Sequence, residues 1–110
     1  MKILVIDDVR VMDFECEYAR NSQEGAYKLA FNGPWDEVWF DHDLGGDDTT
    51  RSIVIGLESA AMMNMKIPKI GKCIVHTSNS SARNWLVDGL KNAGYEVFIT
   101  NPPVVGHIDG

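Results

Sequence analysis

Apolar residues gather in short runs along the chain, and most of these runs stop abruptly at polar residues. Lys2–Ile6, Glu37–Phe40 and Lys72–His76 are apolar at most of their positions, as is typical of parallel strands covered on both faces. Phe14–Asn21 alternates apolar and polar side chains instead, which predicts a strand at a sheet edge with one wet side. Tyr95–Thr100 is predicted to be the last strand.

Three segments between these strands carry apolar residues at helical spacing, with capping residues before them and a glycine or proline after them. Their expected limits are Asn21 or Ser22 to Gly33, Thr49 or Thr50 to about Met65, and Ser80 or Ser81 to Gly94. Alternating strands and helices predict one α/β domain, residues 1–110, on a mostly parallel sheet. Val9–Asp13 is too short for an ordinary helix, and Asn101–Gly110, with two prolines and two glycines, predicts a loop or tail.

Polar residues follow the predicted strands at the point where each strand ends. The clusters are Asp7-Asp8, Asp41-His42-Asp43, His76-Thr77-Ser78-Asn79 and Asn101. Because ligands of such folds bind beyond the carboxyl ends of the strands, we expect the functional site here. Up to four carboxylates would meet, and hard oxygen ligands suit Mg²⁺, Mn²⁺ or Ca²⁺, whereas a histidine ligand favours Mn²⁺, Fe²⁺ or Zn²⁺. The alternative is that these aspartates are solvated turn residues.

The charge balance limits the partners of the protein. A net charge of −6 argues against non-specific binding to nucleic acid or to an anionic membrane. It leaves open one nucleotide or RNA end bound through a metal ion. The chain has neither a basic leader nor a long apolar span, so we expect a cytoplasmic protein. Cys16 and Cys73 fall on strands that two others separate, which predicts reduced thiols rather than a disulfide.

From ILVIDD to FITNPP the chain resembles the receiver domains of bacterial response regulators. The combination of IDDVR, DHDLGGDDT, HTSN and GHIDG is similar to the cyclic-phosphate-processing receiver-like family. The resemblance implies a flavodoxin-like (receiver-like) sandwich with five strands in the order 2-1-3-4-5. It also implies that Asp7, Asp8 and Asp41 hold Mg²⁺, that Asp41 takes the phosphoryl group, and that Thr77 or Ser78 fills the receiver hydroxyl position.

The chain departs from the receiver pattern in three ways. Asn101 stands where receivers place a lysine that contacts the phosphoryl group, which puts conventional signalling in doubt. His42 and His76 are unusual at their positions. The first and last receiver helices have no counterpart in Val9–Asp13 and Asn101–Gly110, so we expect both helices to be reduced or absent.

The favoured hypothesis is a metal-dependent phosphoesterase that acts on a cyclic or terminal phosphate of a nucleotide or RNA end. Mg²⁺ or Mn²⁺ would lie among Asp7, Asp8, Asp41 and Asp43. The candidate catalytic residues are Asp41, His76 as general acid or base, and His42. The candidate phosphate ligands are Arg10, Thr77, Ser78, Asn79 and Asn101. The alternatives are an atypical receiver phosphorylated on Asp41 and a phosphate-binding or assembly module without catalysis.

Each candidate also has a purely structural interpretation. His76 could be an ordinary strand-end histidine, and alternation along the strand favours His42 facing away from Asp41. Arg10 could pair with Asp13, Ser78 and Asn79 could cap the helix that follows, and His107 is expected at the surface. Because two helices are expected to be missing, one apolar face of the sheet would be uncovered. Either the tail or a second copy of the chain would then cover it. Because closed two-fold dimers are the commonest solution, we predict a homodimer packed through the helix-poor face.

Overall fold

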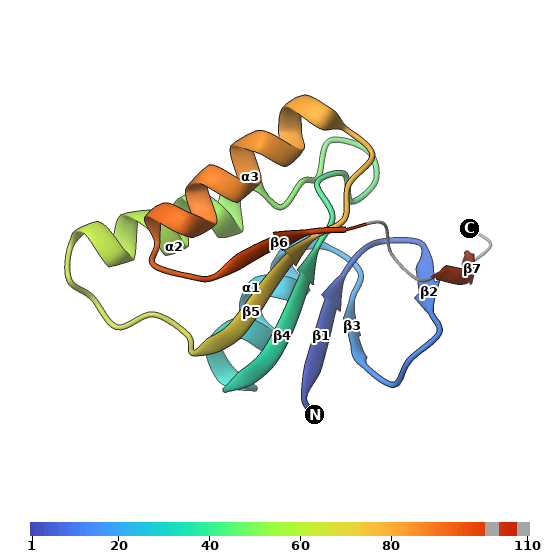
Figure 1. Ribbon diagram of the computed structural model, residues 1–110, viewed down its shortest axis with the longest axis horizontal. Coiled ribbons are helices and arrows are strands. Elements are labelled where there is room, and N and C mark those ends of the chain that lie inside the picture. Colours follow the sequence, from blue (N-terminus) through green and yellow to red (C-terminus); the bar gives the residue numbers. More distant parts are fainter. Residues whose placement is uncertain (101–103, 108–110) are drawn as a thin grey trace.

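The computed structural model describes residues 1–100 and the backbone of a strand at residues 104–107. Five strands form one wholly parallel sheet in the order β3-β1-β4-β5-β6 (Figure 1). Their bounds are β1 Ile3–Ile6, β3 Glu17–Ala19, β4 Trp35–Phe40, β5 Ile70–Val75 and β6 Val97–Ile99. The order of the five is the predicted 2-1-3-4-5, with labels shifted by the extra strand β2. The flavodoxin-like, receiver-like fold class is thus confirmed.

Three helices cover one face of this sheet, and the residues that start and stop them are mostly those expected. They are α1 Ser22–Phe31, α2 Arg51–Met62 and α3 Ser80–Asn92. The side chain of Asn21 caps α1 by accepting a hydrogen bond from the Glu24 N–H at 2.8 Å. Gly94 follows α3 with a φ of 102°, the left-handed conformation that favours glycine. No helix in the described part of the chain is long and apolar enough to span a membrane.

Two helix-end predictions, the start of α3 and the end of α2, were wrong in detail, and the predicted start of α2 was right. Asn79, rather than Ser80 or Ser81, caps α3, because its side chain accepts from the Ala82 N–H at 3.1 Å. Thr50, one of the two expected residues, occupies the N-cap position of α2. Its hydroxyl donates to the backbone carbonyl of Asp41 at 2.7 Å, and the hydroxyl of Thr49, the other expected residue, accepts from the Arg51 N–H at 3.2 Å. Helix α2 ends at Met62 rather than near Met65, two residues before the left-handed Asn64.

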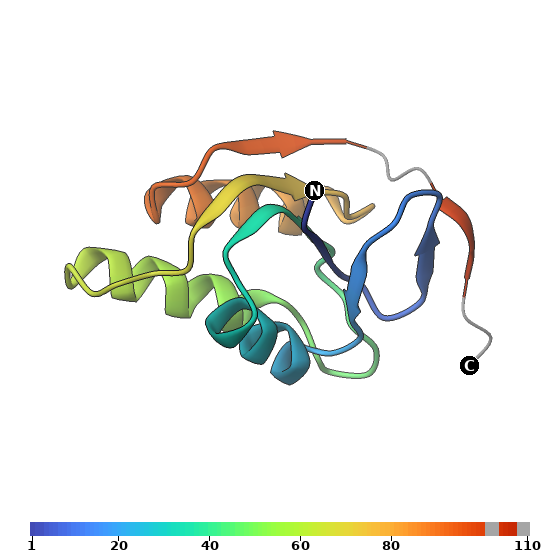
Figure 2. The ribbon, with the colours of Figure 1, turned by 90° about the horizontal axis from the view of Figure 1, so that it is seen from below.

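The segment between β1 and β3 forms a short strand instead of the first receiver helix. Strand β2 (Arg10–Met12) pairs antiparallel with β7 (Val104–His107) in a separate two-stranded sheet. Figures 1 and 2 show this pair at the opposite end of the molecule from α2 and α3. The prediction of a loop for the whole tail was wrong at Val104–His107. Asn101, the expected phosphate ligand, lies outside the described residues.

Side chains from alternate positions build two cores, one on each face of the main sheet. Beneath the helices, β1, β4 and β5 contribute buried apolar side chains: Leu4, Ile6, Val38, Phe40, Cys73 and Val75. On the other face Val5, Trp39 and Ile74 are buried against Met12 and the partly buried Phe14 and Tyr18. The expectation that this face would be open to water was wrong, because the segment after β2 folds across it.

The strand register sets the position of the polar strand ends. Ile6 pairs with Phe40, and Phe40 pairs with Val75. The ladder continues one residue further, with the Asp41 N–H on the Ile6 carbonyl at 3.0 Å and the His76 N–H on the Phe40 carbonyl at 3.1 Å. Asp7, Asp41 and His76 therefore stand in one row across three neighbouring strands.

Candidate functional site

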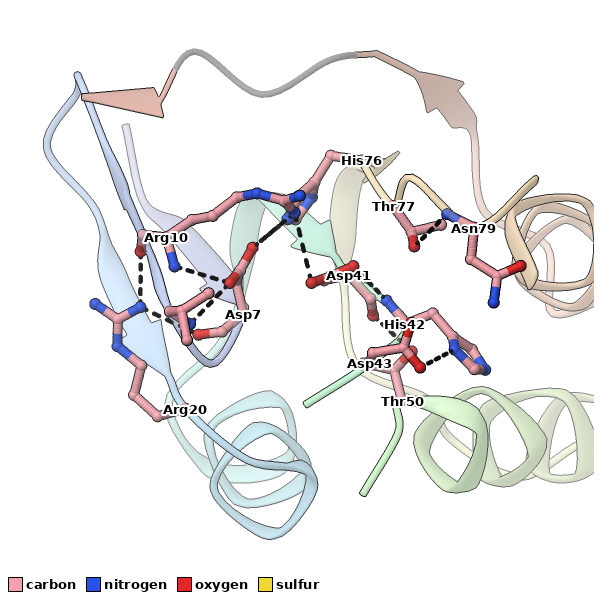
Figure 3. Close-up of polar contacts among 11 residues, drawn as sticks. Asp7, Arg10, Arg20, Asp41, His42, Asp43, Thr50, His76, Thr77 and Asn79 are labelled. Atoms are coloured by element: carbon pink, nitrogen blue, oxygen red, sulfur yellow. Dashed lines mark hydrogen bonds and ion pairs between the residues drawn. The ribbon is translucent and has the colours of Figure 1, made fainter. Parts of the chain in front are cut away.

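A row of three buried polar residues lies at the carboxyl end of the sheet, on the face that the helices leave free. Asp7, Asp41 and His76 each follow a residue that points toward the helices, so their own side chains point to the opposite face. They are 0%, 7% and 2% exposed, respectively. Each side chain offers one potential metal-ligand atom, and these three atoms lie within 4.8 Å of one another, as in a metal-binding cluster (Figure 3).

Asp7 accepts hydrogen bonds on both of its carboxylate oxygens. Oδ1 accepts from the backbone N–H groups of Val9 at 3.0 Å and Arg10 at 2.9 Å. Oδ2 accepts from Nη1 of Arg10 at 3.2 Å and lies 3.0 Å from Nε2 of His76. Burial by itself raises the pKa of Asp7, but the bonds from His76, Arg10 and Val9 outweigh it and hold this pKa well below its ordinary value. Asp7 is therefore a carboxylate at neutral pH.

Asp41 has the opposite electrostatic setting. Burial and then the neighbouring charge of Asp7 raise its pKa above the ordinary value, against the opposing effects of the His42 N–H, His76 and Arg10. Oδ1 accepts from the backbone N–H of His42 at 2.8 Å, and Oδ2 lies 3.5 Å from Nη1 of Arg10. Asp7 and Asp41 therefore repel each other when both are ionised, and a cation in addition to Arg10 would relieve this repulsion.

The contact with Asp7 assigns the proton on His76. Because Asp7 is ionised, its Oδ2 must accept, and Nε2 of His76 carries the donated proton. Nδ1 of His76 is buried and has no hydrogen-bond partner among the described residues. The ring also packs on Trp39, with 5.8 Å between the ring centroids. Asp7 thus orients the imidazole, and Nδ1 is the nitrogen left to take or give a proton.

The residues next to this row face the helices and belong to other contacts. Asp8 is half-buried beside the loop after β4, where a Cβ at Gly45 would lie 3.3 Å from its Oδ2. Nδ1 of His42 lies 3.0 Å from Asp43 Oδ1, and Nε2 of His42 accepts from Nε of Arg51 at 3.0 Å. The structure thus brings Asp7 and Asp41 together with His76, and it places Asp8, His42 and Asp43 outside that cluster.

The predicted phosphate ligands are divided between two places. Arg10 reaches both carboxylates from β2. After β5, Thr77 is buried and its hydroxyl accepts from the Asn79 N–H at 3.2 Å, while Ser78 and Asn79 are exposed. Asn79 is committed to capping α3. His107 lies in β7, where its backbone pairs with Arg10.

Arg20 and Thr50 also shape the site, although neither was among the predicted site residues. Nη1 of Arg20 donates to the backbone carbonyls of Asp7 at 3.1 Å and Arg10 at 2.7 Å, and Thr50 holds the Asp41 carbonyl. A usable signal existed for Arg20. It directly follows the edge strand β3, whose Ala19 pairs with Ile6, so Arg20 stands beside Asp7 in the same row.

The family model of the cyclic-phosphate processing receiver domain matches residues 2–92, a span that contains Asp7, Asp41 and His76. The solved receiver domain of the Francisella response regulator 1452 is similar, with a TM-score of 0.51 and 18% identity over 90% of this chain and 83% of that one. At that identity the likeness is one of fold alone. No curated protein matches the chain.

Proposed function

The chain belongs to the family of cyclic-phosphate processing receiver domains, and from this premise we propose that it is a metal-dependent phosphoesterase. Its substrate is a cyclic or terminal phosphate of a nucleotide or of an RNA end. The observation that carries the proposal is the buried Asp7–His76 pair, which clusters with a second carboxylate, Asp41, and leaves Nδ1 of the imidazole without a hydrogen-bond partner among the described residues. A structural histidine at a strand end needs no such arrangement.

The donor set fits a divalent cation. Two buried carboxylates share one site, and the pKa of Asp41 is raised by burial and by the charge of Asp7, a condition that a bound cation would relieve. Asp7 and Asp41 would hold Mg²⁺ or Mn²⁺, and the half-buried Asp8 is the next carboxylate along the chain. When bound, such an ion polarises a phosphate oxygen and lowers the pKa of a coordinated water.

The side chains of the protein supply the remaining parts. Asp7 fixes the orientation of the His76 ring through Nε2, so Nδ1 can move a proton to or from a reacting oxygen. The Arg10 guanidinium matches the geometry of phosphate oxygens. Exposed Ser78, at the start of α3, can donate to the same phosphate.

The test is turnover of a 2′,3′-cyclic nucleotide in the presence of Mg²⁺ or Mn²⁺, followed by chromatography of the products. His76→Gln should lower kcat by about 10²-fold or more, the contribution of a general acid or base. Its thermal unfolding should stay close to that of the wild type. A comparable loss in His42→Gln would indicate a general disturbance of the strand ends rather than a role of Nδ1 in His76.

A phosphoacceptor switch is the second candidate, and the position of Asp41 at the end of β4 in a receiver fold favours it. Acetyl phosphate with Mg²⁺ would then leave an adduct of about 80 Da, the phosphoryl mass, on Asp41. A stable adduct with no turnover of cyclic nucleotides would replace the phosphoesterase by the switch.

A further inference from the structure

Arg10 occupies the space between the two buried carboxylates. Its Nη1 lies 3.2 Å from Asp7 Oδ2 and 3.5 Å from Asp41 Oδ2, so a single nitrogen bridges both residues (Figure 3). The Arg10 side chain is 20% exposed, whereas those of Asp7 and Asp41 are 0% and 10% exposed. Of the three side chains, that of Arg10 is therefore the most accessible, and its guanidinium contacts carboxylate groups that would also hold a metal ion.

The backbone around Arg10 is held firmly, so this contact is built into the fold. Asp7 Oδ1 accepts the backbone N–H of Arg10, and Nη1 of Arg20 donates to the Arg10 carbonyl at 2.7 Å. The Arg20 guanidinium in turn lies over the Tyr18 ring, 4.0 Å from its centroid. The base of the Arg10 side chain is thus fixed, whereas the guanidinium at its far end can turn about several single bonds.

We propose that Arg10 is the resident counter-ion of the Asp7–Asp41 pair and competes with a divalent cation for it. This inference rests on the proposed function, because it concerns the same carboxylates. A guanidinium and a divalent cation repel each other, and both would draw on the carboxylate groups of Asp7 and Asp41. The cation binds only when the Arg10 guanidinium leaves these oxygens, and the released guanidinium is then available to a phosphate.

If Arg10 competes with the cation, removal of the Arg10 guanidinium should tighten metal binding, whereas removal of a metal ligand would weaken it. Arg10→Met keeps an unbranched, apolar stem and removes the charge and the hydrogen-bond donors. Calorimetric titration with Mn²⁺ should give a Kd about tenfold lower than that of the wild type, the effect of losing one charge-assisted contact. Arg10→Lys keeps the charge, so its Kd should stay near the wild-type value. Asp41→Asn should abolish the binding in the Arg10→Met background, which identifies the site.

Arg51→Met is the matched control, because it removes the same charge close by. Arg51 contacts His42 and stacks on Trp85, and it makes no ion pair with either carboxylate within the described residues. A gain in Mn²⁺ affinity for Arg10→Met that clearly exceeds the gain for Arg51→Met supports the competition. Equal gains would reduce it to a long-range charge effect and overturn it.

The remaining outcomes separate this inference from the proposed function. If the wild type binds Mn²⁺ and Arg10→Met binds equally or more weakly, the inference fails and the metal site stands. If neither protein binds Mn²⁺, both the inference and the metal-dependent function fail. Binding by Arg10→Met but not by the wild type would support the competition in its strongest form. It would also leave the wild-type protein as a phosphate or receiver module rather than a metal enzyme.

Discussion

At the scale of single residues, adjacent polar side chains have different roles because they point to opposite faces of the sheet. Asp7 is fully buried and accepts a hydrogen bond from His76, while Asp8 is half-buried beside Gly45. The same alternation separates Asp41 from His42. Burial and the charge of Asp7 raise the pKa of Asp41, whereas donated hydrogen bonds outweigh burial and lower that of Asp7. Such opposed shifts in one pair of carboxylates are typical of functional sites.

The buried thiol of Cys73 should make the free energy of unfolding depend on pH, independently of the candidate functional site. Burial raises the pKa of Cys73 from 9.0 to about 12. Between these two values the unfolded chain loses the thiol proton and the folded chain keeps it, so the unfolded state binds fewer protons. The free energy of unfolding should therefore be unaffected by this thiol below pH 9. It should fall by up to about 1.4 kcal/mol per pH unit above that.

Urea denaturation at several pH values between about 8 and 11, under reducing conditions, measures this slope. Cys73→Ala should be less stable overall because it leaves a cavity, but its stability should decline less steeply above pH 9. Burial also raises the pKa of Tyr95, so part of the slope should remain at higher pH. Parallel curves for the two proteins would contradict the assignment to Cys73.

At the scale of elements, the described residues place helices on one face of the sheet and a folded loop on the other. Phe14 packs on Trp39 with 5.2 Å between the ring centroids, and the Met12 N–H donates to the Tyr18 hydroxyl oxygen at 2.9 Å. These contacts close the face that a first receiver helix would cover. They also place Arg10, on β2, next to the carboxylates.

Replacement of glycine by alanine should have opposite effects on stability at two positions in the neighbouring helices α2 and α3. A Cβ at Gly89 in α3 would lie 2.5 Å from Cγ1 of Val54, which is buried in α2. Gly89→Ala should therefore push the two helices apart and cost about 1–3 kcal/mol of the free energy of unfolding, partly offset by better helix propensity. A Cβ at Gly56 meets nothing within 4 Å, so Gly56→Ala should add about 0.5–1 kcal/mol.

Chemical denaturation of both variants beside the wild type provides the measurement. The matched pair separates packing from propensity, because the change in the chain is identical and only the surroundings differ. A stabilised Gly89→Ala would show that α2 and α3 can separate without loss of packing.

The elements that the sequence predicted are those whose signal is local. Hydrophobic runs placed the five strands, and spacing and caps placed the three helices, since both depend on neighbouring residues. The β2–β7 pair joins residues about a hundred positions apart through three- and four-residue strands, so no local pattern distinguishes it from a loop. Arg20 has a local signal, because it directly follows an edge strand, but its contacts with the backbone carbonyls of Asp7 and Arg10 match no side-chain motif.

At the scale of the whole molecule, the parallel sheet converts distant sequence positions into one site. Asp7, Asp41 and His76 span 69 residues, yet register and alternation alone bring their side chains to one face. The identities of Asp7, Asp41 and His76 could be predicted because each ends an apolar run. The sequence could not predict that Asp8, His42 and Asp43 lie outside the site. An apolar run does not show which of the polar residues after it points to the same face as the site.

The predicted homodimer has little exposed apolar surface to bury, because the sheet face on which the prediction depended is mostly covered. Val5, Trp39 and Ile74 on that face are 0%, 8% and 6% exposed, so a dimer cannot be driven by burying them. Phe98 pairs with Ile74, shares its face and is 44% exposed at the β6 edge of the sheet. Any dimer through this face should therefore be weak and centred on Phe98, because the exposed apolar area is small beside the roughly 800 Å² per partner of a stable interface.

Sedimentation equilibrium across the micromolar range decides the matter. We expect weak self-association of the 12.2 kDa chain toward a species of twice that mass, and its loss in Phe98→Asp. Phe31→Asp is the control, because this side chain is 73% exposed on α1, in the helical layer. If the wild type remains a 12.2 kDa species at every concentration, the segment that carries Met12 and Phe14 is all the cover that this face requires, and the homodimer is wrong.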